Sequence, residues 1–338
     1  MTAPNGINTN RYKIAIFVLF GIAILVLIIR ISEISFSRTF YIRGLVYLKK
    51  GELDKATRDF REAIQLNKTN YLAYEGLGIA HYEENRFDES LNDYNTAIHF
   101  NQNYADAYYN RGLVFLQIGD IEKSILDFSK AIQLNPGDFK SYVGRGIAYS
   151  IVNRVDKAIY DYNDSIHLNQ NYADAYYNRG LAYSSMGDVD KAISDYTLAI
   201  QLNSGDANIY QDRGWSHYCK GDWEQSINDF ENAIRLNPKN SLAYNNYAWL
   251  LATCPNPSVR NGSKAVELAL KACELTEWKQ WISIDTLAAA YAEAGDFTQA
   301  IKYQTQVIGM EGISEAKRAN AQQKFNLYQQ KKSYQEAP

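Results

Sequence analysis

The sequence predicts an all-α solenoid, in which about eight helical hairpins follow one apolar N-terminal helix. Three observations predict it: a 34-residue periodicity of small and aromatic residues, turn residues between the periodic segments, and a polar, helix-favouring C-terminal segment. The 338 residues are 46% hydrophobic and 22% charged, as in a folded chain. A formal net charge of -3 is unlike that of proteins that bind phosphates through clustered Lys and Arg. We therefore expect no nucleic-acid partner.

The N-terminal region predicts a membrane anchor. Ile14 to Ile29 carries no polar side chain and is flanked by Lys13 and Arg30. Sixteen apolar residues span about 24 Å as a helix, and the flanking cations can extend that span by reaching toward the interface. We predict a short basic tail over residues 1–13 and a transmembrane helix over residues 14–32. The alternative is a cleaved signal peptide, but no A-x-A site follows the apolar run.

The charges around this segment also bear on its orientation. Basic residues lie on both sides of the apolar run, so the positive-inside count is nearly even. A short basic tail before a single apolar run usually stays in the cytoplasm. We therefore expect a single-pass protein of the bacterial inner membrane, with its repeats outside the cytoplasm.

Small and aromatic residues recur along the central region every 34 residues. A glycine recurs at Gly44, Gly78, Gly112, Gly146, Gly180 and Gly214. A second small residue recurs at Ala56, Ser90, Ser124, Ala158, Ala192 and Ser226. An aromatic residue recurs at Phe60, Tyr94, Phe128, Tyr162, Tyr196 and Phe230. A last small residue recurs at Ala63, Ala97, Ala131, Ser165, Ala199 and Ala233. The pattern predicts six regular repeats over residues 37–240.

Each repeat reads as a pair of helices. If the recurring glycine is position 8, the first repeat starts at Ser37. Positions 4, 8 and 11 then lie on one face of a first helix, and positions 20, 24 and 27 lie on one face of a second helix. Small residues at positions 8 and 20 let the two helices approach closely. This period and residue pattern are the signature of the tetratricopeptide repeat, and the chain resembles that family. The resemblance implies a right-handed superhelix.

The period changes after residue 240. Ala248 and Ala265 take positions 8 and 20 at a spacing of 17, so five extra residues form a loop before Ala265. We predict two divergent repeats over residues 241–310, then a C-terminal capping helix and tail over residues 311–338. The stretch DTLAAAYAEAGDFTQAI is similar to the terminal module of bacterial tetratricopeptide proteins, which implies a bacterial repeat protein. The side chains expected to dock the capping helix are Ala316, Ala319, Phe325, Leu327 and Tyr328.

Opposite charges recur at fixed positions. Arginine occupies position 7 at Arg43, Arg111, Arg145, Arg179 and Arg213. Aspartate occupies position 23 at Asp59, Asp93, Asp127, Asp161, Asp195 and Asp229. An arginine that leans toward the start of its helix approaches position 23. The favoured interpretation is a structural ladder of Arg–Asp pairs; the alternative is a row of arginines that binds anions.

A stripe of apolar residues predicts a peptide-binding groove. Positions 2, 5, 9 and 12 of the first helices usually face the concave side of such a solenoid. In the central repeats these positions hold Tyr109, Leu113, Leu116, Val143, Ile147, Tyr177, Leu181, Trp215 and Tyr218. Aromatic and aliphatic anchors of this kind suit an extended or helical peptide. The alternative is that they pack between neighbouring helices.

The sequence offers no catalytic or cofactor motif. It lacks GxxxxGK[ST], HExxH and GxSxG patterns. Its three cysteines, Cys219, Cys254 and Cys273, form no CxxC pair, and its four histidines fall at repeat positions. We therefore expect no enzyme activity, no metal, no cofactor and no small-molecule substrate.

These features together predict a membrane-anchored scaffold that binds proteins or peptides through its repeats. A second hypothesis is a regulatory or substrate-presenting subunit of an enzyme complex encoded elsewhere. A stable enzyme partner would favour the second hypothesis, and diverse partners would favour the first.

Overall fold

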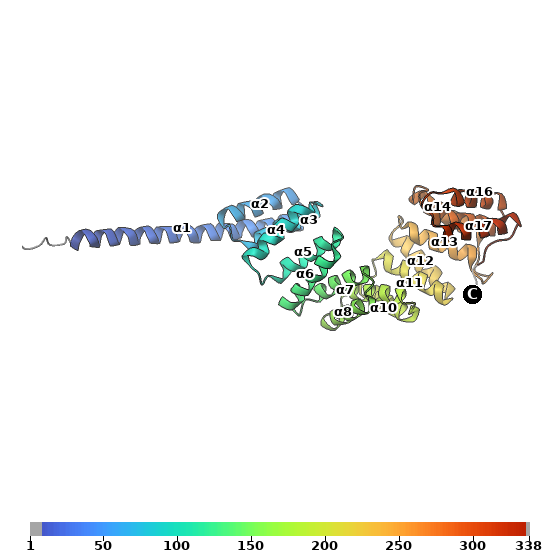
Figure 1. Ribbon diagram of the computed structural model, residues 1–338, viewed down its shortest axis with the longest axis horizontal. Helices are drawn as coiled ribbons and strands as arrows, with labels where there is room; N and C mark the ends of the chain where they lie inside the picture. Colours follow the sequence, from blue (N-terminus) through green and yellow to red (C-terminus); the bar gives the residue numbers. More distant parts are fainter. Residues whose placement is uncertain (1–8, 336–338) are drawn as a thin grey trace, which may run out of the picture. The chain divides into compact units, whose positions relative to one another are not determined.

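The computed structural model describes the backbone of residues 9–335 and the side chains of residues 19, 20 and 22–335. Within that range the chain forms seventeen α-helices and no strand (Figure 1). Residues 1–161 and 162–338 are two compact units. The first unit contains α1 (Thr9–Lys49), α2 (Leu53–Leu66), α3 (Tyr71–Glu83), α4 (Phe87–Phe100), α5 (Ala105–Gln117), α6 (Ile121–Leu134) and α7 (Phe139–Ile151). Helix α8 (Val155–Leu168) crosses the boundary in the sequence. The second unit contains α9 (Ala173–Ser185), α10 (Val189–Leu202), α11 (Ala207–Lys220), α12 (Trp223–Leu236), α13 (Ser241–Thr253), α14 (Gly262–Leu275), α15 (Trp281–Glu293), α16 (Phe297–Gly309) and α17 (Glu315–Gln329).

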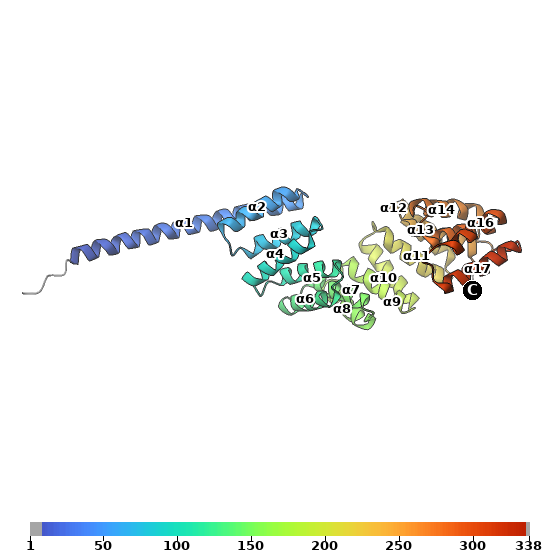
Figure 2. The ribbon, with the colours of Figure 1, turned by 45° about the horizontal axis from the view of Figure 1, so that its top comes forward.

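Consecutive helices pack as hairpins within each unit (Figure 2). The first unit has the hairpins α1–α2, α3–α4 and α5–α6, and the second has α9–α10, α11–α12, α13–α14 and α15–α16. The first helices of the central repeats begin at Tyr71, Ala105, Phe139, Ala173 and Ala207, which are 34 residues apart. The predicted all-α solenoid is therefore confirmed.

The turn inside each regular hairpin uses a left-handed residue at position 15. Gly119 has φ 84°, and Gly187 and Gly221 at the same position have φ 78° and 86°. Asparagine replaces glycine at Asn85 and Asn153, where φ is 59° and 58°. Asparagine tolerates this region better than other residues with a Cβ. Turn geometry therefore restricts this position to two residue types in these repeats.

In two of the repeats the aromatic ring at position 24 fills the space between two glycines. The Phe60 ring lies between Gly44 of α1 and Gly76 of α3, where an added Cβ would meet it at 2.6 Å in both cases. Phe128 lies in the same way between Gly112 of α5 and Gly144 of α7. Each ring is fully buried. Close approach of the helices thus explains why glycine is needed on both sides of the ring.

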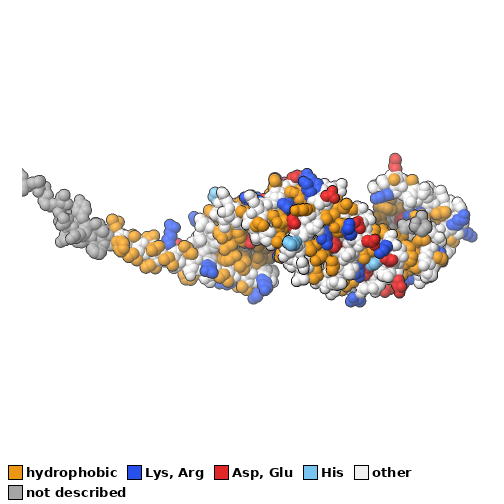
Figure 3. Space-filling model, turned by 90° about the horizontal axis from the view of Figure 1, so that it is seen from below, with side chains coloured by type: hydrophobic (Ala, Val, Ile, Leu, Met, Phe, Trp, Pro, Cys, Tyr) orange, Lys and Arg blue, Asp and Glu red, His pale blue; other side chains and the backbone are white. Residues whose placement is uncertain are grey.

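Helix α1 runs from the predicted apolar segment into the first repeat without a break. Ser37 is the first buried residue among its described side chains, and its hydroxyl donates to the Ala63 carbonyl oxygen at 2.7 Å. Most of the described side chains before it are exposed and hydrophobic (Figure 3). Among the described residues, no helix has both the length and the apolar character that crossing a bilayer requires. The side chains of residues 14–18 and 21 of the predicted span, residues 1–8 of the predicted tail and the side chains of residues 9–13 lie outside the described part of the chain.

Candidate functional site

The arginines at position 7 bind the aspartates at position 23 of their own repeats. Arg213 donates from Nε to Asp229 Oδ2 at 2.8 Å and from Nη2 to Oδ1 at 2.7 Å. Its Nη1 also donates to Thr197 of the preceding repeat at 3.1 Å. The same two-pronged contact joins Arg43–Asp59, Arg111–Asp127, Arg145–Asp161 and Arg179–Asp195. The carboxylates are nearly buried, so these arginines act as structural partners of buried charges.

Asp93 has a different partner because position 7 of its repeat is Leu77. Its Oδ2 lies 2.7 Å from Nδ1 of His81, which occupies position 11. His81 is buried, and its Nε2 has no hydrogen-bond partner. Burial raises the pKa of Asp93, and the hydrogen bond from His81 opposes that rise. The histidine therefore replaces the missing arginine.

The candidate groove residues of the first unit are buried or partly buried. Val143 is 4% exposed, so the prediction that it faces a partner is wrong. Tyr109 occupies the same repeat position as Val143. Its ring packs toward the second helix of its hairpin, 5.8 Å from the ring of Phe128. The remaining predicted residues of this unit are partly buried, namely Tyr109, Leu113, Leu116 and Ile147.

Two of the candidate groove residues of the second unit are held in internal contacts, and two remain accessible. Tyr177 packs 6.0 Å from Tyr196, and its hydroxyl donates to a carboxylate of α11. Tyr218 is 7% exposed because it packs between Trp215 and Trp223, so its prediction as a groove residue is also wrong. Leu181 and Trp215 remain accessible, each 37% exposed.

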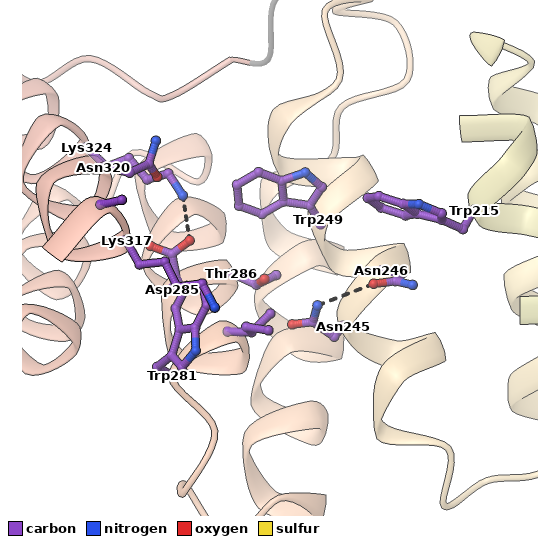
Figure 4. A pocket seen from close by; sticks show the side chains of 12 residues that line it. Trp215, Asn245, Asn246, Trp249, Trp281, Asp285, Thr286, Lys317, Asn320 and Lys324 are labelled. Carbon is purple, nitrogen blue, oxygen red and sulfur yellow. Dashed lines mark hydrogen bonds and ion pairs between the residues drawn. The ribbon is translucent and has the colours of Figure 1, made fainter. Parts of the chain in front are cut away.

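Trp215 lines a pocket whose other lining residues were not part of the predicted groove. The pocket has a volume of about 440 Å³ and lies between α11, α13, α15 and α17 (Figure 4). It is lined by Trp215, Asn245, Asn246, Trp249, Trp281, Ile282, Asp285, Thr286, Ala316, Lys317, Asn320 and Lys324. Three first helices and the C-terminal helix therefore build one site in the second unit.

An internal ion pair forms one side of this pocket. Lys324 Nζ of α17 lies 2.5 Å from Asp285 Oδ2 of α15, and both residues are buried. Gln304 donates to the other oxygen of Asp285 at 2.9 Å. The Lys324 ammonium also lies over the rings of Trp249 at 4.6 Å and Tyr334 at 5.0 Å. Asp285 is thus neutralised and hydrogen-bonded by the protein itself.

Two asparagines of α13 lie between the tryptophans. Asn245 is 5% exposed and donates from Nδ2 to Asn246 Oδ1 at 3.4 Å, which is a long hydrogen bond. The Asn245 Oδ1 atom is buried and accepts no hydrogen bond. Buried acceptors are rarely left without a donor.

A second lysine lies at the pocket edge. Lys317 of α17 is exposed, and its ammonium lies 5.0 Å from the centre of the Trp281 ring. It forms no ion pair with a carboxylate of the described chain. Because Lys324 and Asp285 neutralise each other, Lys317 gives the pocket a net positive charge.

The helical spacing explains why these side chains meet. Asn245 and Trp249 are four residues apart on α13, and Lys317 and Lys324 are seven apart on α17, so each pair shares a helix face. Helix α17 docks through the buried residues Ala321, Lys324 and Tyr328. Of the predicted docking residues, Tyr328 is fully buried and Phe325 and Leu327 are partly buried, whereas Ala316 and Ala319 are exposed. The prediction is therefore wrong for the two alanines, and Ala321 and Lys324 dock instead.

Sequence reasoning missed most of this site, although part of its signal was present. Trp249 occupies position 9 of the seventh repeat, the same position as Trp215 in the sixth. Extending the positional rule past residue 240 would have found Trp249 and Asn245. The lysines of α17 carry no such signal, because their placement depends on how that helix docks.

The described residues contain no group of three or more His, Cys, Asp and Glu side chains placed to hold a metal ion. Cys254 and Cys273 are buried, and Cys219 is exposed. Burial raises the pKa of Cys273 to about 12, so its thiol stays protonated at neutral pH. A protonated thiol is a poor nucleophile and a poor metal ligand.

Solved structures similar to this chain are repeat proteins. A tetratricopeptide repeat protein from Parabacteroides merdae is 14% identical, with a TM-score of 0.52 over 87% of this chain and 99% of that one. PilF of Pseudomonas aeruginosa is 18% identical, with a TM-score of 0.59 over 64% and 98%. MamA is 28% identical over 49% of this chain and 96% of its own, with a TM-score of 0.44. The first two likenesses show the fold alone. No curated protein matches the chain.

Family models match most of the repeat region. Models described as TPR repeat or tetratricopeptide repeat match residues 44–85, 80–119, 105–138, 153–187, 173–206, 207–240 and 230–263. Together these matches cover more than half of the chain and coincide with the helical hairpins of the fold. The chain belongs to the tetratricopeptide repeat family.

Proposed function

We propose that this chain is a scaffold that binds a partner protein or peptide in the pocket between α11, α13, α15 and α17. The observation that carries the proposal is the pocket itself: three tryptophans line one accessible cavity together with amide side chains. Aromatic side chains in partly enclosed sites are common anchors of protein interfaces. The pocket therefore offers accessible aromatic anchors, which the mostly buried or partly buried stripe of the central repeats does not.

The site also favours binding over catalysis. Its one carboxylate, Asp285, is held by Lys324 and Gln304 and has no remaining role as a general base. Asn245, Asn246 and Thr286 can exchange hydrogen bonds with a peptide but supply no proton transfer. We propose that the chain contributes recognition only.

A matched pair of tryptophans tests the binding site. Trp215 lines the pocket and stacks on Tyr218, whereas Trp278 lies elsewhere and stacks on Tyr303. Both indoles are 37% exposed. Partners captured on the full-length chain in mild detergent should be lost with Trp215→Ala and kept with Trp278→Ala, with equal helicity by circular dichroism.

The composition of the captured set separates two roles. A varied set of partners that all depend on Trp215 indicates a scaffold. One enzyme at fixed stoichiometry indicates a regulatory or substrate-presenting subunit instead. Equal capture by both tryptophan variants would mean that the pocket is not the partner site.

We also propose that the N-terminal helix holds the chain at a membrane. The support is the exposure of apolar residues along α1 before the first repeat: Leu19, Leu27 and Ile31 are 66%, 59% and 59% exposed. Burying such residues in lipid would be favourable. Because α1 continues directly into the first repeat, the repeats would be joined to the anchor without a flexible linker.

Membrane association is measured by carbonate extraction. The full-length chain should stay in the membrane pellet, and a chain that lacks residues 1–30 should be soluble and helical. A bacterial inner-membrane protein with its repeats outside the cytoplasm would lose its repeats to protease added to spheroplasts. A soluble chain shortened at its N terminus would show that the segment is a signal peptide.

A further inference from the structure

We infer that the pocket recognises a peptide segment in which a large apolar side chain stands beside a carboxylate group. This inference rests on the proposed function, since it specifies the ligand of the same site. It follows from three properties of the pocket: its indole rings, its net charge and its amide side chains.

The indoles define the apolar part of the ligand. Trp215 and Trp249 come from neighbouring first helices, and Trp281 lies toward the C-terminal helix (Figure 4). Ile282 adds a further apolar surface and is 45% exposed. A cavity of about 440 Å³ exceeds the volume of one aromatic side chain, so it can also hold adjoining peptide backbone.

The charges define the polar part. Lys324 is already paired with Asp285, and the second oxygen of Asp285 accepts from Gln304. Lys317 is exposed at the edge and lacks an ion-pair partner in the described chain. A carboxylate entering here would meet one uncommitted cation, whereas a basic side chain would meet two lysines and no available anion. Like charges at a binding site select against basic ligands.

The amide side chains of the lining define the backbone contact. Asn246 and Asn320 line the pocket, and the exposed Asn320 can accept a hydrogen bond from an incoming N–H group. A peptide amide carries this donor at every residue except proline. An extended segment can therefore place an amide on Asn320, an apolar side chain among the indoles and a carboxylate near Lys317.

The carboxylate has two possible sources with the same chemistry. It can be the side chain of an Asp or Glu, or the free carboxylate at the end of a partner chain. Random peptides displayed with a free C terminus, and a second set displayed with both ends joined to carrier protein, separate the two. A preference that appears only in the first set identifies the chain end.

The test selects such peptides on the full-length chain in mild detergent and on its Trp215→Ala variant. Peptides that need Trp215 should carry an aromatic or large aliphatic residue next to Asp, Glu or a free carboxylate. Binding of a selected peptide, measured by fluorescence anisotropy, should weaken at least tenfold with Lys317→Glu, which is about 1.4 kcal/mol. Selection on that variant should favour Lys or Arg in place of the acid.

Lys302→Glu is the matched control. Lys302 is also exposed and lies over an aromatic ring, 5.1 Å from Tyr303, but it is not part of the pocket. Reversing the charge of Lys302 should leave the peptide preference unchanged. Peptides that need Trp215 but show no acidic preference, or the same preference on Lys317→Glu, would overturn the inference while leaving the pocket as a binding site. A lack of any peptide that depends on Trp215 would overturn it as well, and native partner capture would then decide the proposed function separately.

Discussion

The Tyr177 hydroxyl donates a hydrogen bond of 2.8 Å to Oδ2 of Asp212, and this bond joins α9 to α11. Burial raises the pKa of Asp212, and the hydrogen bonds from Tyr177 and Gln211 oppose that rise. The tyrosine thus satisfies a carboxylate between two repeats. A residue that looks like a groove anchor in the sequence is a structural contact between first helices.

Replacing Tyr177 with Phe should therefore lower stability rather than only weaken partner binding. The variant leaves the buried Asp212 carboxylate with one donor fewer, which costs about 1–3 kcal/mol. Urea unfolding followed by circular dichroism measures the loss. Tyr160→Phe is the control, since that ring is 67% exposed and its hydroxyl should contribute little. Equal midpoints for the two variants would contradict the structural role of Tyr177.

The Arg–Asp pairs should differ in their contribution to the free energy of unfolding, because water reaches some of them more easily than others. The side chain of Arg213 is 17% exposed and that of Asp229 is 2% exposed. Arg213→Ala leaves Asp229 buried without its cation, so we expect a loss of about 3–5 kcal/mol in the free energy of unfolding. A double-mutant cycle with Asp229→Ala should show strong coupling between the two residues.

Arg43 provides the comparison within the same set of pairs. Its side chain is 53% exposed, although it contacts Asp59 in the same two-pronged way. Water can replace more of its contacts, so Arg43→Ala should be less destabilising than Arg213→Ala. A larger loss for Arg43→Ala would show that exposure does not set the contribution of these pairs.

Glu75 should make stability depend on pH. It is buried between α3 and α5, where Tyr104 donates to Oε2 at 2.5 Å and Asn110 donates to Oε1 at 3.1 Å. Burial raises the pKa of Glu75 from 4.5 to about 7, and these hydrogen bonds limit the rise. The folded state therefore binds this proton more tightly than the unfolded state.

The sign of the pH effect follows from that difference. The contribution of Glu75 to the free energy of unfolding is fully present below pH 4.5 and is lost as the pH rises through about 7. Its size is at most about 3 kcal/mol. Glu75→Gln should remove this part of the pH dependence, as measured by urea unfolding across that range. Parallel pH profiles for the two proteins would contradict the raised pKa.

The period of the sequence predicted the hairpins but not which side chains remain accessible. Gly44 and Phe60 show why: the glycine at position 8 meets the aromatic ring at position 24 in close contact, so these core positions are fixed and repeat in all six units. Tyr109 and Val143 were assigned to a groove by position alone, yet both lie against neighbouring helices. Accessibility depends on the size of the residues around a position, which the period does not contain.

The pocket was harder to predict because it depends on a contact outside the repeat pattern. Lys324 is a buried charge on a helix for which only apolar residues were predicted to dock. Its partner Asp285 is 39 residues away in the sequence, and Gln304 completes the contact. A polar network of this kind leaves no periodic signal.

The inserted loop before α14 gives a last prediction. Asn261 N–H donates to the Leu251 carbonyl oxygen at 2.9 Å, and Arg260 donates to Glu293 Oε1 at 2.9 Å. These bonds bring Gly262 against the end of α15, where an added Cβ would overlap the Ala294 backbone nitrogen and lie 2.6 Å from the Glu293 carbonyl carbon. Backbone atoms cannot rotate away as a side chain can.

Gly262→Ala should therefore force α14 and α15 apart and lower the melting temperature by several degrees. Gly309 is the control, because an added Cβ there meets no atom within 4 Å and the residue is helical. Gly309→Ala should be neutral or stabilising by up to about 1 kcal/mol, since alanine favours the helix more than glycine does. Differential scanning calorimetry of the two variants measures both effects. Equal melting temperatures would show that the loop before α14 can shift without a loss of stability. Because Trp281, Asp285 and Thr286 lie on α15, a shift of that helix should also weaken any peptide that depends on Trp215.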